Sequence, residues 1–310
     1  YKFARRMINI NINNEIGQLK SVILGTATDF GGTPKEEDCY DPKSKENVLK
    51  GTFPIEKDLS EELNQFREVL EKYNVKIFRP ETIKHLNQIF TRDIAFVIDD
   101  KIIIPNIISD RSNEINGINY LLQELDPKKI LRLGIDSRVE GGDVILSNNR
   151  IFIGYSKEND FVKYKVARTN EAAIEEISSF FPDKEVLSFE LNKSDTNAKE
   201  NALHLDCCFQ PIGKNMAIIY EGGFRNNKDV DYLNNYFGSD NLIKISQEEM
   251  YNMNSNVFSI SEDIIVSEKG FNRLNSILRE KGFIVEEISF SETAKMEGLL
   301  RCSTLPLHRL

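Results

Sequence analysis

Short apolar runs recur in pairs along the chain, and each pair predicts a β-hairpin. Within a pair, a polar turn such as Ser147-Asn148-Asn149 or Gly213-Lys214-Asn215 separates the two runs. Between the pairs, apolar residues recur at helical spacing, as in 56–73. The four pairs are 94–98 with 102–104, 144–146 with 151–153, 207–212 with 216–220, and 257–260 with 264–266. Hairpins that alternate with helices limit the chain to an α/β fold made of repeated units.

The spacing of these hairpins indicates an internal repeat. Successive hairpins begin roughly 45–65 residues apart, and the runs at 19–24 and 302–307 supply a candidate fifth unit. A closed ring is the simplest arrangement that brings the front edges of all units together. We therefore predict a single catalytic α/β-propeller domain over residues 1–310. Residues 1–14 are expected to be a peripheral or expression-derived lead-in.

Composition and charge exclude several classes of function. With 310 residues, of which 40% are hydrophobic, the chain can bury a large core. Its net charge of −9 argues against nucleic-acid binding, because that partner needs a basic face. No apolar run approaches the roughly 18 residues of a membrane span, and the segment before Met7 lacks a signal-peptide core. We therefore expect a cytoplasmic protein that binds neither nucleic acid nor membranes.

The cysteines and histidines weigh against disulfide and metal sites. Cys207 and Cys208 are adjacent and therefore awkward partners for each other, and nothing else suggests a disulfide framework. The three histidines and four cysteines form no Cys-x-x-Cys or His-x-x-x-His pattern, whereas a structural zinc site needs paired ligands at short spacing. We expect no metal and no cofactor.

Cys302 is the best candidate for a catalytic nucleophile. It stands between Arg301 and Ser303, where an apolar strand is predicted to begin. A single such cysteine with a distant histidine is typical of cysteine catalysis, because the partners meet only in the fold. His204 and Asp206 are two residues apart on a predicted strand and would share one face. This suits an acid/base histidine beside a carboxylate that binds a cation, although alternating polarity is also common on half-exposed strands.

Two carboxylates stand at the front edges of other units. Asp93 leads into the buried run 94–98, and such a carboxylate costs free energy unless it meets a cation. Arg92 would supply that cation in an ordinary surface pair. Glu140 opens a Glu-Gly-Gly-Asp segment before the next strand, where the glycines permit close backbone approach. The same Glu-Gly-Gly at 221–223 follows a strand instead, so the tripeptide alone is a weak signal.

Taken together, these segments resemble the guanidine-modifying superfamily of arginine deiminases, dimethylarginine dimethylaminohydrolases and amidinotransferases. The resemblance implies an α/β propeller (pentein) of five ββαβ-type units around a pseudo-fivefold axis. It covers the chain from about residue 15 onward. The matching segments are Asn87-Gln-Ile-Phe-Thr-Arg-Asp93, Glu140-Gly-Gly-Asp143, Ala167-Arg-Thr-Asn170, His204-Leu-Asp206 and Arg301-Cys-Ser-Thr-Leu-Pro306.

The resemblance also implies roles for individual residues. Cys302 is expected to be the nucleophile, His204 the general acid/base, and Glu140 the carboxylate that orients the histidine. Asp93 and Asp206 are expected to grip the guanidinium by charge-assisted hydrogen bonds. Asn87, Arg92 and Arg168 are expected to position the substrate and its carboxylate. Phe90 and Asp143 are further expected substrate-binding residues.

The resemblance is not uniform across the subfamilies. The segment 295–301 has one glycine and Glu297 where deiminases usually have a glycine-rich stretch with an arginine, so it looks more like the dimethylarginine hydrolases. Those hydrolases generally lack the aspartate seen here as Asp206, which disfavours a methylated substrate. We therefore expect an arginine deiminase-like hydrolase that forms an S-amidino-cysteine and releases citrulline and ammonia. An amidinotransferase with an acceptor such as glycine, a dimethylarginine hydrolase and a non-enzymatic propeller are the alternatives. The expected partner is a small guanidino compound, and a homo-oligomer is compatible with the resemblance.

Overall fold

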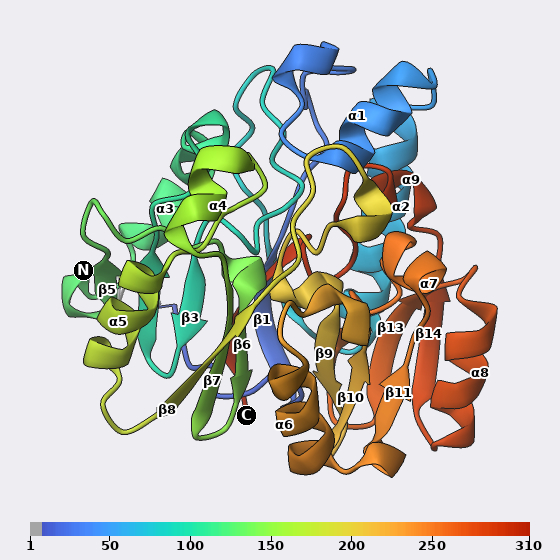
Figure 1. The fold of residues 1–310 in the computed structure, drawn as a ribbon. Helices are drawn as coiled ribbons and strands as arrows, with labels where there is room; N and C mark the ends of the chain where they lie inside the picture. The colour runs from blue at the N-terminus through green and yellow to red at the C-terminus, as the bar shows by residue number, and fades with distance from the viewer. Residues whose placement is uncertain (1–7) are drawn as a thin grey trace.

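Five three-stranded mixed sheets organise the protein. The computed structural model describes residues 8–310 and is shown in Figure 1. In each sheet an antiparallel hairpin is followed by a third strand parallel to the middle one. The sheets are β15(Thr304–Arg309)-β1(Leu19–Leu24)-β2(Lys76–Phe78), β3(Phe96–Ile98)-β4(Lys101–Ile104)-β5(Ile130–Arg132), β6(Val144–Ser147)-β7(Arg150–Tyr155)-β8(Glu185–Glu190), β9(Phe209–Ile212)-β10(Met216–Ile219)-β11(Leu242–Lys244) and β12(Phe258–Ser259)-β13(Ile264–Glu268)-β14(Ile284–Ile288).

A helix precedes the third strand of every sheet, because a parallel pair needs a crossover connection. These helices are α2(Glu56–Lys72), α3(Asn119–Leu122), α5(Glu171–Phe180), α6(Asn227–Phe237) and α8(Asn272–Glu280). In α2, Leu59, Leu63 and Phe66 form the buried stripe that the sequence spacing predicts. The remaining α-helices in residues 8–310 are α1(Pro42–Leu49), α4(Glu158–Lys163), α7(Gln247–Tyr251) and α9(Ser291–Ala294). None of the helices in this range is long and apolar enough to cross a membrane.

All five predicted hairpins are present, but three begin two residues later than expected. The runs predicted to start at 94, 207 and 302 become strands at Phe96, Phe209 and Thr304. The polar residues ahead of them therefore lie on the segments that enter the sheets. In particular, Leu205–Cys207 forms a short 3-10 helix, η7, with His204 just before it in extended backbone. The expectation that His204 and Asp206 share one face of a strand is therefore wrong.

The fifth unit joins the two ends of the described chain. β15 pairs antiparallel with β1, with Leu24 opposite Thr304. Ahead of β1, Ile10 and Ile12 are buried, and Asn11 forms a parallel bridge with His308. Residues 8–14 therefore pack into the protein, and the expected peripheral lead-in is wrong for them because their isoleucines complete the core. Residues 1–7 lie outside the described part of the chain.

Candidate active site

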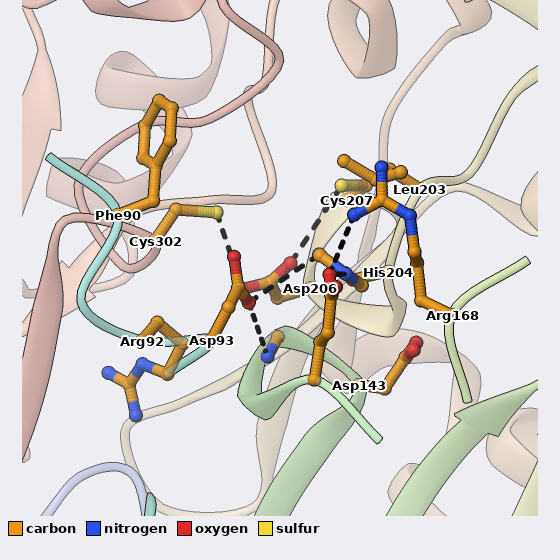
Figure 2. A network of polar contacts seen from close by, with 12 residues as sticks. Phe90, Arg92, Asp93, Asp143, Arg168, Leu203, His204, Asp206, Cys207 and Cys302 are labelled. Carbon is orange, nitrogen blue, oxygen red and sulfur yellow. Dashed lines mark hydrogen bonds and ion pairs between the residues drawn. The ribbon is translucent and has the colours of Figure 1, made fainter. Parts of the chain in front are cut away.

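The polar residues that precede the first strands of the sheets meet in one buried cluster (Figure 2). Cys302 lies two residues before β15 and is 2% exposed. Its Sγ is 3.6 Å from Asp206 Oδ2, and Asp206 Oδ1 lies 3.8 Å from the Sγ of Cys207. Asp206 belongs to η7, the turn that leads into β9. The structure thus places the candidate nucleophile beside one of the two expected guanidinium-binding carboxylates.

His204 and Glu140 form the second part of the cluster. His204 Nε2 lies 2.7 Å from Glu140 Oε2, and the other ring nitrogen, Nδ1, lies 3.7 Å from Asp93 Oδ1. Gly142 makes this approach feasible, because a Cβ there would lie 2.7 Å from His204 Nδ1. The Glu-Gly-Gly segment therefore supplies both a partner for the histidine and the space for its ring.

Asp93 is neutralised by a cation that the sequence did not reveal. Its Oδ2 accepts a hydrogen bond from Arg111 Nη1 at 2.6 Å, and its Oδ1 accepts the backbone N–H of Gly142 at 3.0 Å. Arg111 also donates to both carboxylate oxygens of Glu114 and to the carbonyl of Phe90. The Arg111 guanidinium is buried and held by two bonds to Glu114. It therefore fixes the orientation of the Asp93 carboxylate and also neutralises its charge.

Arg301 neutralises Asp206 as Arg111 neutralises Asp93. Its Nη1 donates to Asp206 Oδ2 at 2.9 Å, while Nη2 and Nε donate to Glu15 at 3.0 and 3.1 Å. A further bond runs from Nη2 to the carbonyl of Val144. Arg301 is fully buried, so these partners are required to offset the desolvation of its charge.

The electrostatics favour a charged His204–Glu140 pair. Burial alone would lower the pKa of His204, but Asp93, Glu140 and Asp143 outweigh it and raise the pKa above its usual value. Burial would likewise raise the pKa of Glu140, but Arg168, His204 and Arg111 hold that pKa well below its usual range. The histidine is therefore arranged to carry a proton that it can donate.

The surroundings of the Cys302 thiol, in contrast, disfavour its charged form. Burial and the carboxylates of Asp206 and Asp93 raise the pKa of Cys302 well above its usual range. The nearby Arg301 opposes this rise without cancelling it, so the thiol form predominates, and a thiol is a poor nucleophile.

Two expected substrate-binding residues lie away from the cluster centre. Figure 2 shows the Arg92 side chain extending away from Cys302, where it donates to the carbonyl of Arg301 and to Thr304 Oγ1 at 3.2 Å each. Asp143 is fully buried, and its oxygens accept bonds from Thr169 Oγ1 and from the backbone N–H of Leu205. Both side chains are therefore engaged with residues around the site, and their direct contact with a substrate stays a prediction.

The other expected residues lie at the edges of the cluster. Arg168 donates to Glu140 Oε2 at 2.8 Å and to the carbonyl of Tyr40 at 2.6 Å, so it lies behind Glu140. Phe90 and Asn87 line an adjoining cavity, and Asn87 Oδ1 accepts the backbone N–H of Ile89.

The fifth sheet contributes a residue that the sequence did not reveal. Asn256, two residues before β12, accepts the backbone N–H of Cys302 through Oδ1 at 3.1 Å. Its Nδ2 donates to the carbonyl of Asp206. Asn256 has no charge and stands in a polar run at 254–256. Its position at the front edge of the fifth hairpin was the one signal that could have found it.

Asp93, Glu140 and His204 also present ligand atoms within 4.8 Å of one another, a spacing that a metal ion could use. However, Arg111 and Arg168 lie 2.6 and 2.8 Å from two of these carboxylates. A divalent ion would have to share the carboxylates with two guanidinium groups, so the donor set suits an acid/base histidine better.

Comparison with known proteins identifies the family. Residues 45–309 match the model of the family described as N,N dimethylarginine dimethylhydrolase, eukaryotic. The chain belongs to this family. Membership in the guanidine-modifying superfamily, expected from the sequence, is thereby confirmed.

Relatives of this dimethylarginine dimethylhydrolase family member are distant in sequence and similar in fold. An uncharacterized protein of Bacillus subtilis, YkgA, is 29% identical over 82% of this chain and 81% of its own length. The N-terminal domain of ArgZ, a cyanobacterial arginine dihydrolase, has a TM-score of 0.76 at 17% identity and covers 94% of this chain and 98% of that domain. An inosamine-phosphate amidinotransferase of Streptomyces griseus has a TM-score of 0.76 at 16% identity, covering 97% of each chain. These structures share the α/β fold described above.

Proposed function

We propose that this family member is a cysteine-dependent hydrolase of the guanidino C–N bond of arginine or a close analogue. The observation that carries the proposal is the meeting of Cys302, His204 and the carboxylates of Asp93 and Asp206 in one buried cluster. A guanidinium is resonance-stabilised and cationic, so its carbon is a poor electrophile unless it is held beside the nucleophile. Two carboxylates in the same cluster as the thiol, one of them 3.6 Å from its sulfur, support that arrangement.

The substrate itself would activate the thiol. In the free protein, the carboxylates of Asp206 and Asp93 keep the Cys302 pKa high. A guanidinium held between these carboxylates places a positive charge next to the sulfur and lowers that pKa again. The Cys302 thiolate therefore forms when the guanidino carbon that it attacks is already beside it.

The chemistry would then proceed in two displacements. The Cys302 thiolate bonds to the guanidino carbon, and a C–N bond breaks as His204 donates its proton to the leaving amine. This step leaves an S-amidino-cysteine and, from arginine, ammonia. Neutral His204 next takes a proton from water, which attacks the same carbon and displaces the sulfur. The sum is arginine plus water giving citrulline plus ammonia, and Glu140 holds the histidine throughout.

The family match favours one alternative, a dimethylarginine hydrolase that releases dimethylamine. Asp206 argues against it: its Oδ2 lies 3.6 Å from the sulfur, where a methylated guanidino nitrogen could donate fewer hydrogen bonds to it. The amidinotransferase remains the other alternative, since it uses the same covalent intermediate.

Mass spectrometry of three incubations separates these reactions. We expect arginine alone to give citrulline and ammonia, with no effect of added glycine. Ornithine that forms only with an acceptor, together with the amidino derivative of that acceptor, would establish the transferase. Release of dimethylamine from dimethylarginine, with arginine inert, would establish the dimethylarginine hydrolase.

We also propose that the five sheets close into a propeller around a pseudo-fivefold axis. This is supported by the pairing of β15 with β1 and by the meeting of residues from the entry segments of all five sheets. Those residues are Asp93 before β3, Glu140 before β6, Asp206 before β9, Asn256 before β12 and Cys302 before β15. A crystal structure tests the closure through the order of neighbouring sheets around the cluster.

A further inference from the structure

A cavity of about 210 Å³ adjoins the catalytic cluster. Phe90, which lines it, belongs to the segment whose Arg92 backbone N–H donates to the carbonyl of Cys302 at 3.1 Å. Figure 2 shows the Phe90 ring next to Cys302. Met296, on the segment that leads to the nucleophile, lines the cavity as well. A substrate whose guanidinium lies between the two aspartates therefore has this cavity beside it for its tail.

Two arginines connect the cavity wall to the catalytic carboxylates. Glu114, a lining residue, holds Arg111, which in turn holds Asp93. The carbonyl of Tyr40, another lining residue, accepts from Arg168, which holds Glu140. The cavity and the cluster are thus parts of one hydrogen-bonded assembly.

The charges around this cavity are negative. Its lining includes Asp38, Asp41, Asp110 and Glu114, and none of the lining residues in the described chain is Lys or Arg. Its one histidine, His85, is exposed, and Nδ1 lies 3.1 Å from Asp29. A carboxylate entering this cavity would meet repulsion, whereas an ammonium group would be attracted.

Asp38 and Asp41 are the carboxylates available to a ligand. Glu114 and Asp110 are already paired with Arg111 and Lys165 at 2.8 and 2.9 Å. Within residues 8–310, Asp38 and Asp41 have no salt-bridge partner at 4.0 Å or less. Asp41 is buried and accepts the backbone N–H of Ser44 at 2.6 Å, so its position is fixed before a ligand arrives.

A further buried carboxyl group lies next to Asp41. Glu297 is 6% exposed; its Oε1 accepts from Asn201 Nδ2 at 2.8 Å, and its Oε2 has no partner among the described residues. Burial and the nearby Asp41 raise the pKa of Glu297 well above its usual range. Lys43 lies beside this pair, but its Nζ donates to the carbonyl of Tyr251, and burial lowers its pKa to about 8. No lysine or arginine among residues 8–310 forms a salt bridge with Asp41 or Glu297, so a cationic ligand can still pair with this corner of the cavity.

Aromatic side chains complete the wall. Tyr40, Phe53 and Phe90 line the same cavity as the two free carboxylates. Aromatic faces attract cations, and the effect grows when the site is partly shielded from water. Carboxylates and aromatic rings together are the usual surroundings of a bound ammonium group.

We propose that this cavity binds the ammonium tail of a guanidinoalkyl amine, and that decarboxylated arginine (agmatine) is preferred over arginine itself. The inference rests on the proposed function, because that function places the guanidinium at the aspartates. Arginine carries an α-carboxylate that Asp38 and Asp41 repel, whereas decarboxylation removes this charge and keeps the amine.

A second cavity offers the opposite chemistry. It has a volume of about 340 Å³ and is lined by Arg138, Lys165 and Arg168, so a carboxylate would suit it. However, Arg168 donates to Glu140, to Tyr40 and to the carbonyl of Lys165, so its guanidinium separates that cavity from the cluster. The acidic cavity is favoured because Phe90 and Met296 connect it directly to the nucleophile segment.

Binding to the full-length Cys302→Ala protein, measured by isothermal titration calorimetry, tests the inference without turnover. We expect agmatine to bind at least about tenfold more tightly than arginine, a ratio that corresponds to one charge-assisted contact. Butylguanidine, whose tail is uncharged, should fall between them. Equal or tighter binding of arginine overturns the inference. If Arg138→Ala or Lys165→Ala then weakens arginine binding, the second cavity is the one that holds the tail.

Charge-neutral variants test the two carboxylates. Asp38→Asn and Asp41→Asn should each weaken agmatine binding about tenfold and leave butylguanidine unchanged. Asparagine is also a good N-cap, so Asp41→Asn keeps the cap of α1. Glu36→Gln is the matched control, since Glu36 is an exposed acid on the same short helix as Asp38 and does not line the cavity. An equal loss for butylguanidine in either variant contradicts a role in tail recognition.

Turnover of the wild-type protein separates failure of this inference from failure of the proposed function. Agmatine that binds tightly but forms no adduct on Cys302 supports the cavity assignment and refutes the chemistry. Arginine that is hydrolysed faster than agmatine supports the chemistry and refutes the cavity assignment.

Discussion

Asn256 holds the backbone N–H of Cys302 through its Oδ1, at 3.1 Å. The same side chain donates to the carbonyl of Asp206, so one amide fixes both the proposed nucleophile and a carboxylate proposed to bind the guanidinium. We expect Asn256→Ala to lower kcat by about 10–100-fold through misplacement of the sulfur, with KM changing less. Asn254→Ala is the matched control: this neighbour is also buried, and its side-chain Oδ1 has no hydrogen-bond partner among the described residues. Similar losses in both variants, measured by steady-state kinetics, would indicate a general packing effect instead.

Removing the thiol should abolish turnover. We expect Cys302→Ala and Cys302→Ser to retain the fold and to show no activity above contaminant level, because no covalent intermediate can form. Cys207→Ala and Cys208→Ala should keep substantial activity, although Cys207 also lies near Asp206. Circular dichroism and product assays on the four variants provide the test, and measurable turnover by Cys302→Ala would rule out the mechanism.

His204 should be required for both proton transfers. General acid–base groups contribute about 10²–10⁴-fold, so His204→Ala should lose at least that much kcat. An adduct on Cys302 should accumulate in this variant if the histidine also activates water, and intact-protein mass spectrometry would detect it. Glu140→Gln should give a smaller loss in the same direction, because it leaves the imidazole unpaired. An unchanged kcat for His204→Ala across pH 5–9 would refute the assignment.

The carboxylate of Asp206 should control the titration of the thiol. It raises the pKa of Cys302, so Asp206→Asn should lower that pKa and shift the pH profile of alkylation by iodoacetamide toward lower pH. The variant should nevertheless lose at least tenfold in kcat/KM, because a guanidinium contact is gone. Peptide mapping distinguishes Cys302 from Cys207. Asp93→Asn should behave like Asp206→Asn. An alkylation profile that does not move, or that moves toward higher pH, would contradict this electrostatic account.

Glu15 should stabilise the fold in a pH-dependent way. Although burial opposes its ionisation, Arg301 and Arg92 lower the pKa of Glu15 to about 2. Because this folded-state pKa is depressed, the stabilisation is present above about pH 4.5 and is lost as the pH falls toward 2. Glu15→Gln removes one of the two carboxylates that pair with the buried Arg301, so the free energy of unfolding should fall by about 1.5–3 kcal/mol at neutral pH. Urea denaturation at pH 7 and pH 3 should show the difference between the two proteins shrinking in acid.

The sequence predicted the five hairpins because their signal is local. Apolar runs, polar turns and helical spacing are properties of adjacent residues, and the strands formed within a few residues of the expected bounds. Cys302, His204, Glu140, Asp93 and Asp206 each stand where a hairpin begins, and the resemblance to the guanidine-modifying superfamily gave them their expected roles. The fold brings those positions together.

The supporting residues could not be found in the same way. Arg92 is next to Asp93 in the sequence, yet neighbouring side chains diverge, and the cation that reaches Asp93 is Arg111 from 18 positions further along. Glu15 meets Arg301 across a separation of 286 residues. Such ion pairs depend on which loops face each other in the fold, and the periodicity of residues within one segment does not predict this. Similarly, the step from extended backbone to a 3-10 turn at His204 depends on the bond from Leu205 to Asp143.

The pairing of β15 with β1 also sets the order of events during synthesis. Asp206 leaves the ribosome 96 residues before Cys302, and β1 emerges earlier still. Until β15 follows, the antiparallel edge of β1 exposes unpaired backbone groups to other nascent chains. A contact between Leu24 and Thr304 is among the most distant that this chain can make, and distant pairings form slowly. We therefore expect the Cys302 sulfur to reach its place beside Asp206 in one of the last folding steps, so that an incomplete chain would lack the proposed activity.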